Sequence, residues 1–216
     1  MVKRAMLITL PEHDERTSIC SRLSEEVISV AEKSGVDVFD LRKDRADRKN
    51  VTGVLLKKKP KLVVFNGHGD EETICGHDDS VLIKVDDNEK LLGGKIVYTI
   101  ACNSAKKLGP QCIKKGTKTF MGYREVFAWM TDKYARNIER DAIAKAIFAP
   151  SNAIPITIIK GHTTGEAYAR SQKIAEDKIL YYKLNEENLP EAPNVLQLLL
   201  WNKMNQTILG DTEAKF

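Results

Sequence analysis

The sequence predicts an α/β fold with a mostly parallel central sheet covered by helices. Short runs of consecutive apolar residues recur up to about residue 125, and most are followed by a stretch with helical spacing. Strands that are apolar throughout are typical of parallel sheets, because such sheets are buried on both faces. The chain has 216 residues, 42% of them hydrophobic and 30% charged, which suits an ordinary globular domain.

Five strands are expected in this first part of the chain. They are Ala5–Leu10, Val36–Leu41, Lys61–Asn66, Lys95–Ile100 and Lys118–Gly122. A helix that Ser18 can cap is expected to run to Gly35, and another, over Val51–Lys58, ends at Pro60. The alternating segment Thr73–Val85 contains a turn and predicts a small hairpin projecting from the sheet end.

After Tyr123 the pattern becomes helical. Helices are expected over Tyr134–Phe148, ending before Pro150, and over Thr163–Lys183 and Asn194–Met204. The apolar run Ile154–Ile159 fits a sixth strand or an extended connection, and Thr207–Asp211 fits a last short strand. No repeat or linker is evident, so we expect one domain over residues 1–216, with a helical part at about 163–204 packed on it.

Charge and cysteine content indicate a cytoplasmic protein. The net charge is +4, and the basic runs at 42–49 and 57–59 are interpreted as solvated surface, because no aromatic residues are interleaved as in a nucleic-acid site. The first ten residues are too short an apolar run for a signal peptide, and no membrane span is expected. The four cysteines are therefore expected to be reduced.

Two of the expected strands end in reactive groups. One continues into Asn66-Gly67-His68-Gly69-Asp70 and the other into Ala101-Cys102-Asn103-Ser104-Ala105. Function gathers at the carboxyl ends of the strands in an open parallel sheet. If the two strands are neighbours, an imidazole and a thiol face one crevice, and such a pair can carry out nucleophilic acyl transfer.

The residues around this pair suit the same chemistry. Gly67 and Gly69 allow a sharp turn and a close approach of substrate. The backbone amides of Gly69 and Cys102 can together form an oxyanion hole. A helix opening at Asn103-Ser104-Ala105 would place its N-terminus beside Cys102, and this predicts a lowered thiol pKa.

These two motifs resemble the caspase-like superfamily of cysteine peptidases (clan CD), especially its CHAT and gingipain-like members. The resemblance implies a three-layer α/β/α sandwich of about six strands in the order 2-1-3-4-5-6. It implies His68 as catalytic histidine, Cys102 as nucleophile and Gly69 in the oxyanion hole. A polypeptide substrate and no cofactor are implied as well. Further likeness lies in Gly116–Arg124 and in Ile208-Leu209-Gly210-Asp211.

The sequence departs from the caspases themselves, because Ile100-Ala101-Cys102-Asn103-Ser104 stands where they have Gln-Ala-Cys-x-Gly. Aspartate specificity is therefore not expected. A catalytically silent or partner-gated module of the same fold remains the alternative.

Other polar residues are candidates for the rim of a substrate cleft. They are His13, Asp70, Cys75 and His77. A zinc site from His68, Cys75 and His77 is conceivable, but structural zinc needs four closed ligands, so no metal is expected.

Four competing interpretations are weaker. A phosphatase loop needs an arginine where Leu108 stands, and an amidotransferase elbow needs glycines around the thiol. A flavodoxin-like phosphate loop needs glycine after the first strand, where acidic residues stand. His162 adjoins an N-cap and needs no catalytic explanation.

Overall fold

The computed structural model describes residues 4–216, and a six-stranded sheet forms its centre. The order is β2-β1-β3-β6-β7-β8; β8 is antiparallel to β7 and all other neighbours are parallel. The strands are β1 Ala5–Leu10, β2 Asp37–Arg42, β3 Leu62–Phe65, β6 Ile96–Thr99, β7 Thr119–Tyr123 and β8 Gln206–Gly210. Counting only these six strands, this is the predicted order 2-1-3-4-5-6.

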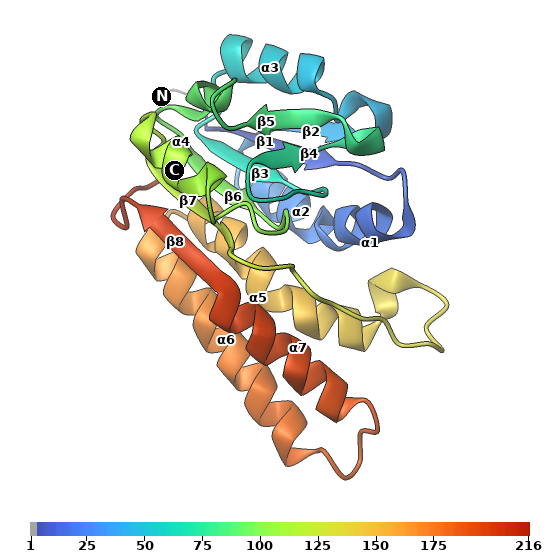
Figure 1. Cartoon of the computed structure of the whole chain (residues 1–216). Helices are drawn as coiled ribbons and strands as arrows, with labels where there is room; N and C mark the ends of the chain where they lie inside the picture. The colour runs from blue at the N-terminus through green and yellow to red at the C-terminus, as the bar shows by residue number, and fades with distance from the viewer. Residues whose placement is uncertain (1–3) are drawn as a thin grey trace.

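Seven α-helices are described, and they lie on both faces of the sheet (Figure 1). They are α1 Glu15–Leu23, α2 Glu25–Lys33, α3 Arg48–Lys57, α4 Leu108–Lys114, α5 Ala142–Ile159, α6 Thr164–Leu184 and α7 Ala192–Asn205. The predicted hairpin is present as β4 Thr73–Cys75 and β5 Val81–Lys84. The α/β prediction is confirmed.

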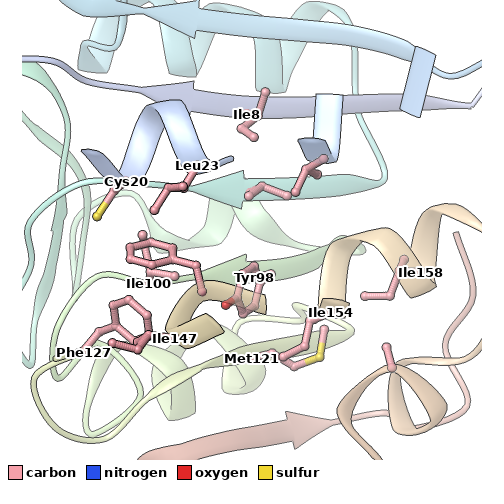
Figure 2. Close-up of a cluster of buried hydrophobic side chains, with 14 of the residues drawn as sticks. Ile8, Cys20, Leu23, Tyr98, Ile100, Met121, Phe127, Ile147, Ile154 and Ile158 are labelled. Carbon is pink, nitrogen blue, oxygen red and sulfur yellow. The ribbon is translucent and has the colours of Figure 1, made fainter. Parts of the chain in front are cut away.

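Successive side chains of each strand point to opposite faces of the sheet, and each face has its own hydrophobic core. On β1, Met6 and Ile8 belong to one cluster and Leu7 to the other. The larger cluster joins the sheet to α1, α2 and α5, and Figure 2 shows Leu23, Tyr98 and Ile147 among its members. The smaller cluster joins the opposite face to α3, α4 and the hairpin. Burial on both faces explains why the strands are continuously apolar.

The prediction for residues 134–159 was wrong. The helix begins at Ala142, where the Asp141 side chain accepts hydrogen bonds from two amides of the first turn, and it continues through Pro150 and Pro155 to Ile159. A proline inside a helix costs about 3 kcal/mol, and here nearly continuous burial of α5 offsets that cost. A short apolar run does not distinguish a strand from a buried helix.

The helix α5 is also long and apolar enough to span a membrane, with a mean hydropathy of 1.5. However, 78% of it is buried inside the structure, as in the core helix of a globular protein. It packs against α6, which packs against α7, and these three helices lie side by side in Figure 1.

The start of the first helix also differs from the prediction. Asp14, and not Ser18, caps α1, because its side chain accepts the Thr17 amide at 2.7 Å. The helix expected to run to Gly35 is two helices that meet at Ser24.

The basic run that follows β2 is partly neutralised. Arg42 pairs with Glu25 and Asp40, and Arg48 lies 2.7 Å from a carboxylate oxygen of Asp87.

Candidate active site

The register of two neighbouring strands sets His68 level with Cys102. Leu62 of β3 pairs with Ile96 of β6, an offset of 34 residues (96 − 62) that holds throughout the pairing. His68 and Cys102 differ by the same number (102 − 68). Neighbouring strands lie about 4.8 Å apart, so continuing the register brings the imidazole and the thiol to the same edge of the sheet.

Gly69 keeps the two loops together beyond the strand ends. A Cβ atom at this position would lie 2.8 Å from Ala101 Cβ and 2.7 Å from the Thr73 carbonyl oxygen, so only glycine fits. Gly69 faces Ile74 in an isolated antiparallel bridge, whose hydrogen bonds are made by the residues on either side of Gly69. The Gly69 amide consequently points away from the hairpin, and it donates no hydrogen bond to any residue in the described range 4–216.

A buried polar cluster anchors the end of β3 to β1. The Asn66 side chain donates to the Thr9 carbonyl at 3.0 Å, and the Thr9 hydroxyl bonds to the Asn66 backbone. Ser24 adds a bond to the Asn66 side chain from the start of α2. Since satisfied buried polar groups give a segment one well-defined position, the chain is held in place two residues before His68.

His68 makes a short contact with Asp14, the N-cap of α1. His68 Nε2 and Asp14 Oδ2 are 2.7 Å apart. Burial alone would raise the pKa of Asp14, but hydrogen bonds from Thr17 and His68 outweigh it, so this pKa lies well below its usual range. The ionised carboxylate only accepts hydrogen bonds, which assigns the proton to Nε2 and leaves Nδ1 as the basic nitrogen.

A cavity of about 540 Å³ opens beside this pair and is lined by both His68 and Cys102. Its remaining lining comes from the start of α1, from Cys20 and Ile100, and from the segment 126–131 that follows β7. That segment is fixed to α7, because the Asn202 side chain bonds both backbone groups of Ala128 and the Trp201 indole donates to the Val126 carbonyl. The cavity therefore has one largely apolar, well-supported wall.

Cys102 is half-buried, and its surroundings contradict the predicted thiol activation. The helix expected directly after it does not form there, because Asn103 has a left-handed φ of 57° and α4 begins only at Leu108. Burial raises the pKa of the Cys102 thiol, although the Phe127 amide and the charge of Arg16 oppose the shift. The resting side chain is accordingly a thiol at neutral pH.

The residues predicted for the rim of the cleft do not line this cavity. Of the residues that line it within the described part of the chain, none is His13, Asp70, Cys75 or His77. His13 is partly buried between two imidazoles, with its ring centroid 5.7 Å from that of His68 and 5.3 Å from that of His77. Among the described residues, the conceivable zinc set of His68, Cys75 and His77 does not come together as a group of metal-ligand atoms. The group that does is His13, Asp14 and His68.

Sequence reasoning missed Asp14, Arg16 and the wall 126–131. Asp14 had a readable signal, because an aspartate three residues before Thr17 is a typical N-cap. The segment 126–131 had none, since only the packing of α7 brings it to the sheet edge.

Comparison with known proteins gives a likeness of structure. No protein-family model and no curated protein matches the sequence. The Arg-specific cysteine proteinase gingipain R matches with a TM-score of 0.57 and 12% identity, over 97% of this chain and 46% of that one. Separase, in the Saccharomyces cerevisiae separase–securin complex, matches with a TM-score of 0.54 and 13% identity, over 97% of this chain and 12% of that one.

The chain thus spans under half the length of either protein, and at these identities the likeness concerns the fold and not the roles of residues. Because each match covers 97% of this chain, the likeness includes the six-stranded sheet and the helices on its two faces. The chain has the caspase-like fold.

Proposed function

We propose that this protein is a cysteine endopeptidase that uses Cys102 and His68. The observation that carries the proposal is that both side chains line one cavity at the ends of adjacent parallel strands. The fold of two structural neighbours, one of them a cysteine proteinase by name, supports the same general class.

The raised thiol pKa favours general-base catalysis over a preformed ion pair. As the Cys102 sulfur attacks the scissile carbonyl carbon, its proton passes to Nδ1 of His68. The imidazolium then gives this proton to the leaving amine, and a thioester on Cys102 remains. Water attacks the thioester while His68 again takes the proton, and the carboxylic acid and the free thiol are released.

Asp14 acts as a positioning residue in this scheme. Its carboxylate holds the proton on Nε2 of His68 and stabilises the positive charge that develops on the ring. The amides of Gly69 and Cys102 are the proposed oxyanion donors, since neither donates a hydrogen bond to a backbone carbonyl among residues 4–216.

The cavity suggests what the enzyme accepts. Phe127, Trp129 and Met130 offer apolar contacts, and Arg16 and Glu15 place both signs of charge at the opposite side. We propose a polypeptide with an apolar residue near the cut as substrate, acted on in the cytoplasm.

A peptide-library digest comparing wild type with Cys102→Ala tests the proposal. Cleavage by wild type and its loss in the variant are expected, with Cys75→Ala, the other half-buried cysteine, as a matched control. Cleavage that persists in Cys102→Ala contradicts the proposed nucleophile.

The raised pKa of Cys102 also favours a second candidate, a module that a bound partner gates. Wild type would then be silent alone and become active, with the same dependence on Cys102, only when a partner is added. Silence with every partner would leave a binding role for the fold and exclude the endopeptidase.

A further inference from the structure

The two ring nitrogens of His13, a partly buried residue, are themselves buried and make no hydrogen bond within the described residues. Its side chain is only 11% exposed, and Nε2 lies 3.5 Å from Oδ1 of the exposed Asp79, with which it pairs only when the ring is protonated. A buried polar atom left without a hydrogen bond destabilises the fold. An imidazole held in this way at the edge of a candidate active site calls for a ligand.

The neighbours of His13 supply the rest of a binding site. One ligand atom each from His13, Asp14 and His68 lie within 4.8 Å of one another. The tightest pair, His68 Nε2 and Asp14 Oδ2, is 2.7 Å apart. Ligands bound to tetrahedral zinc at about 2.0–2.2 Å are about 3.4 Å from each other, which lies between these two distances.

The carboxylate is already oriented for this role. Asp14 Oδ1 accepts hydrogen bonds from the amide and the hydroxyl of Thr17, both at 2.7 Å, while Oδ2 faces His68. Oδ2 can therefore bind a cation without loss of the helix cap, and Thr17 supplies the outer partner that ligating carboxylates usually have.

The ligand set selects the kind of metal. Two imidazole nitrogens and one carboxylate oxygen suit zinc and similar first-row divalent ions, with a fourth position open to solvent, and suit calcium or magnesium poorly. Asp79 beside His13 adds negative charge at the site.

We propose that His13, Asp14 and His68 bind one divalent transition-metal ion, with Zn²⁺ as the representative, and that binding withdraws His68 from catalysis. A metal on Nε2 replaces the Asp14 hydrogen bond and occupies the nitrogen through which that carboxylate supports the imidazolium. The metal would thus act as a reversible inhibitor. This regulatory step rests on the proposed function, whereas the binding of the metal does not.

Calorimetric titration of the metal-free full chain with zinc chloride tests the binding. One equivalent is expected to bind, and His13→Gln, which keeps the size and polarity of the side chain, should weaken binding at least about tenfold. His162→Gln is the matched control, because His162 is an exposed histidine that pairs only with Glu166 among the described acids. Cys102→Ala should bind zinc as wild type does.

Undiminished zinc binding in His13→Gln would overturn the proposed site. Loss of zinc binding in Cys102→Ala would overturn it too, because the metal would then be bound by the thiol. Folding of each variant is checked by circular dichroism. If His13→Gln does not fold, the Co²⁺-loaded wild type decides: absorption bands of a thiolate–cobalt bond would refute the nitrogen–oxygen ligand set.

Peptide hydrolysis tests the regulatory step, with every variant compared with its own rate in a chelating buffer. Zinc should inhibit wild type at the concentrations at which it binds, and His13→Gln should resist that inhibition. Equal inhibition of both contradicts the regulation. If wild type is inactive in the chelating buffer, the proposed function fails while the calorimetry still decides the metal site.

Discussion

Replacing Asp14 by asparagine separates two roles that one carboxylate combines. Asparagine is as good an N-cap as aspartate, so the bonds that Asp14 Oδ1 accepts from Thr17 should be kept. The negative charge that faces His68 Nε2 at 2.7 Å is lost. The amide can also place a donor against Nε2, which moves the ring proton to Nδ1 and removes the proposed base.

The size of the effect follows from the geometry of this pair. A hydrogen bond between charged groups contributes about 1.5–3 kcal/mol. The two side chains are 34% and 40% exposed, so solvent screening places the value near the lower end. A loss of about 1.5–2 kcal/mol in the transition state lowers kcat/KM about 10- to 30-fold, and the change of tautomer adds to this.

The assay is kcat/KM on the best peptide from the library, together with urea unfolding and ¹⁵N chemical shifts of the His68 ring. The matched control is Asp47→Asn, since Asp47 caps α3 by accepting the Asn50 amide at 2.7 Å and faces no histidine. Asp47→Asn should retain wild-type stability to within about 0.5 kcal/mol, whereas Asp14→Asn should also lose the stabilisation that its charge gains from His68. Equal kcat/KM in wild type and Asp14→Asn, or an equal loss in both variants, refutes the positioning role of Asp14.

Three further outcomes are expected. Gly69→Ala forces a Cβ atom to within 2.8 Å of its neighbours and should destabilise the fold by about 1–3 kcal/mol in urea unfolding. The control is Gly53→Ala on α3, where a Cβ atom meets nothing within 4 Å, and this variant should be neutral or stabilised by up to about 1 kcal/mol. Because burial raises the pKa of Cys102, its alkylation by iodoacetamide should still accelerate between pH 7 and about 9, and Arg16→Gln should slow it at fixed pH; a plateau below neutral pH would contradict this. Because the pKa of Asp14 is lowered in the folded protein, its stabilisation is present above the unfolded value of about 3.9 and is lost as the pH falls below it. Between about pH 5 and pH 2, the free energy of unfolding should therefore fall less steeply with decreasing pH in Asp14→Asn than in wild type. Parallel curves would count against the lowered pKa of Asp14.

Local pattern predicted the sheet because each strand carries its own signal. Ala5–Leu10 and Lys61–Asn66 are apolar runs closed by proline or glycine signals, and both strands formed within one residue of those bounds. The same kind of signal gave a wrong prediction of a strand or extended connection at Ile154–Ile159. This apolar segment is helical although it contains Pro155, because nearly all of its residues are buried in the core. Periodicity does not reveal how many sides of a segment are buried.

The activation of Cys102 was predicted from a helix that does not begin there. The Asn103 amide bonds to the Glu125 carbonyl instead, and a left-handed residue after the thiol prevents a helix from starting. The raised pKa then follows from burial of the thiol, which outweighs the hydrogen bond from the Phe127 amide. A pKa depends on the surrounding dielectric and charges, which come from distant parts of the chain.

The sequence by itself determined the α/β class, the order of the strands through the family likeness, and the position of a histidine and a cysteine at two strand ends. These features are local, since apolar runs and glycine-flanked polar residues act over a few positions. Only the tertiary structure decided that Asp14 meets His68, that the ring nitrogens of His13 are buried without a hydrogen bond, and that α7 holds the wall of the cavity. Each of these contacts joins segments brought together by the closing of the sheet and its helices, and no short pattern encodes them.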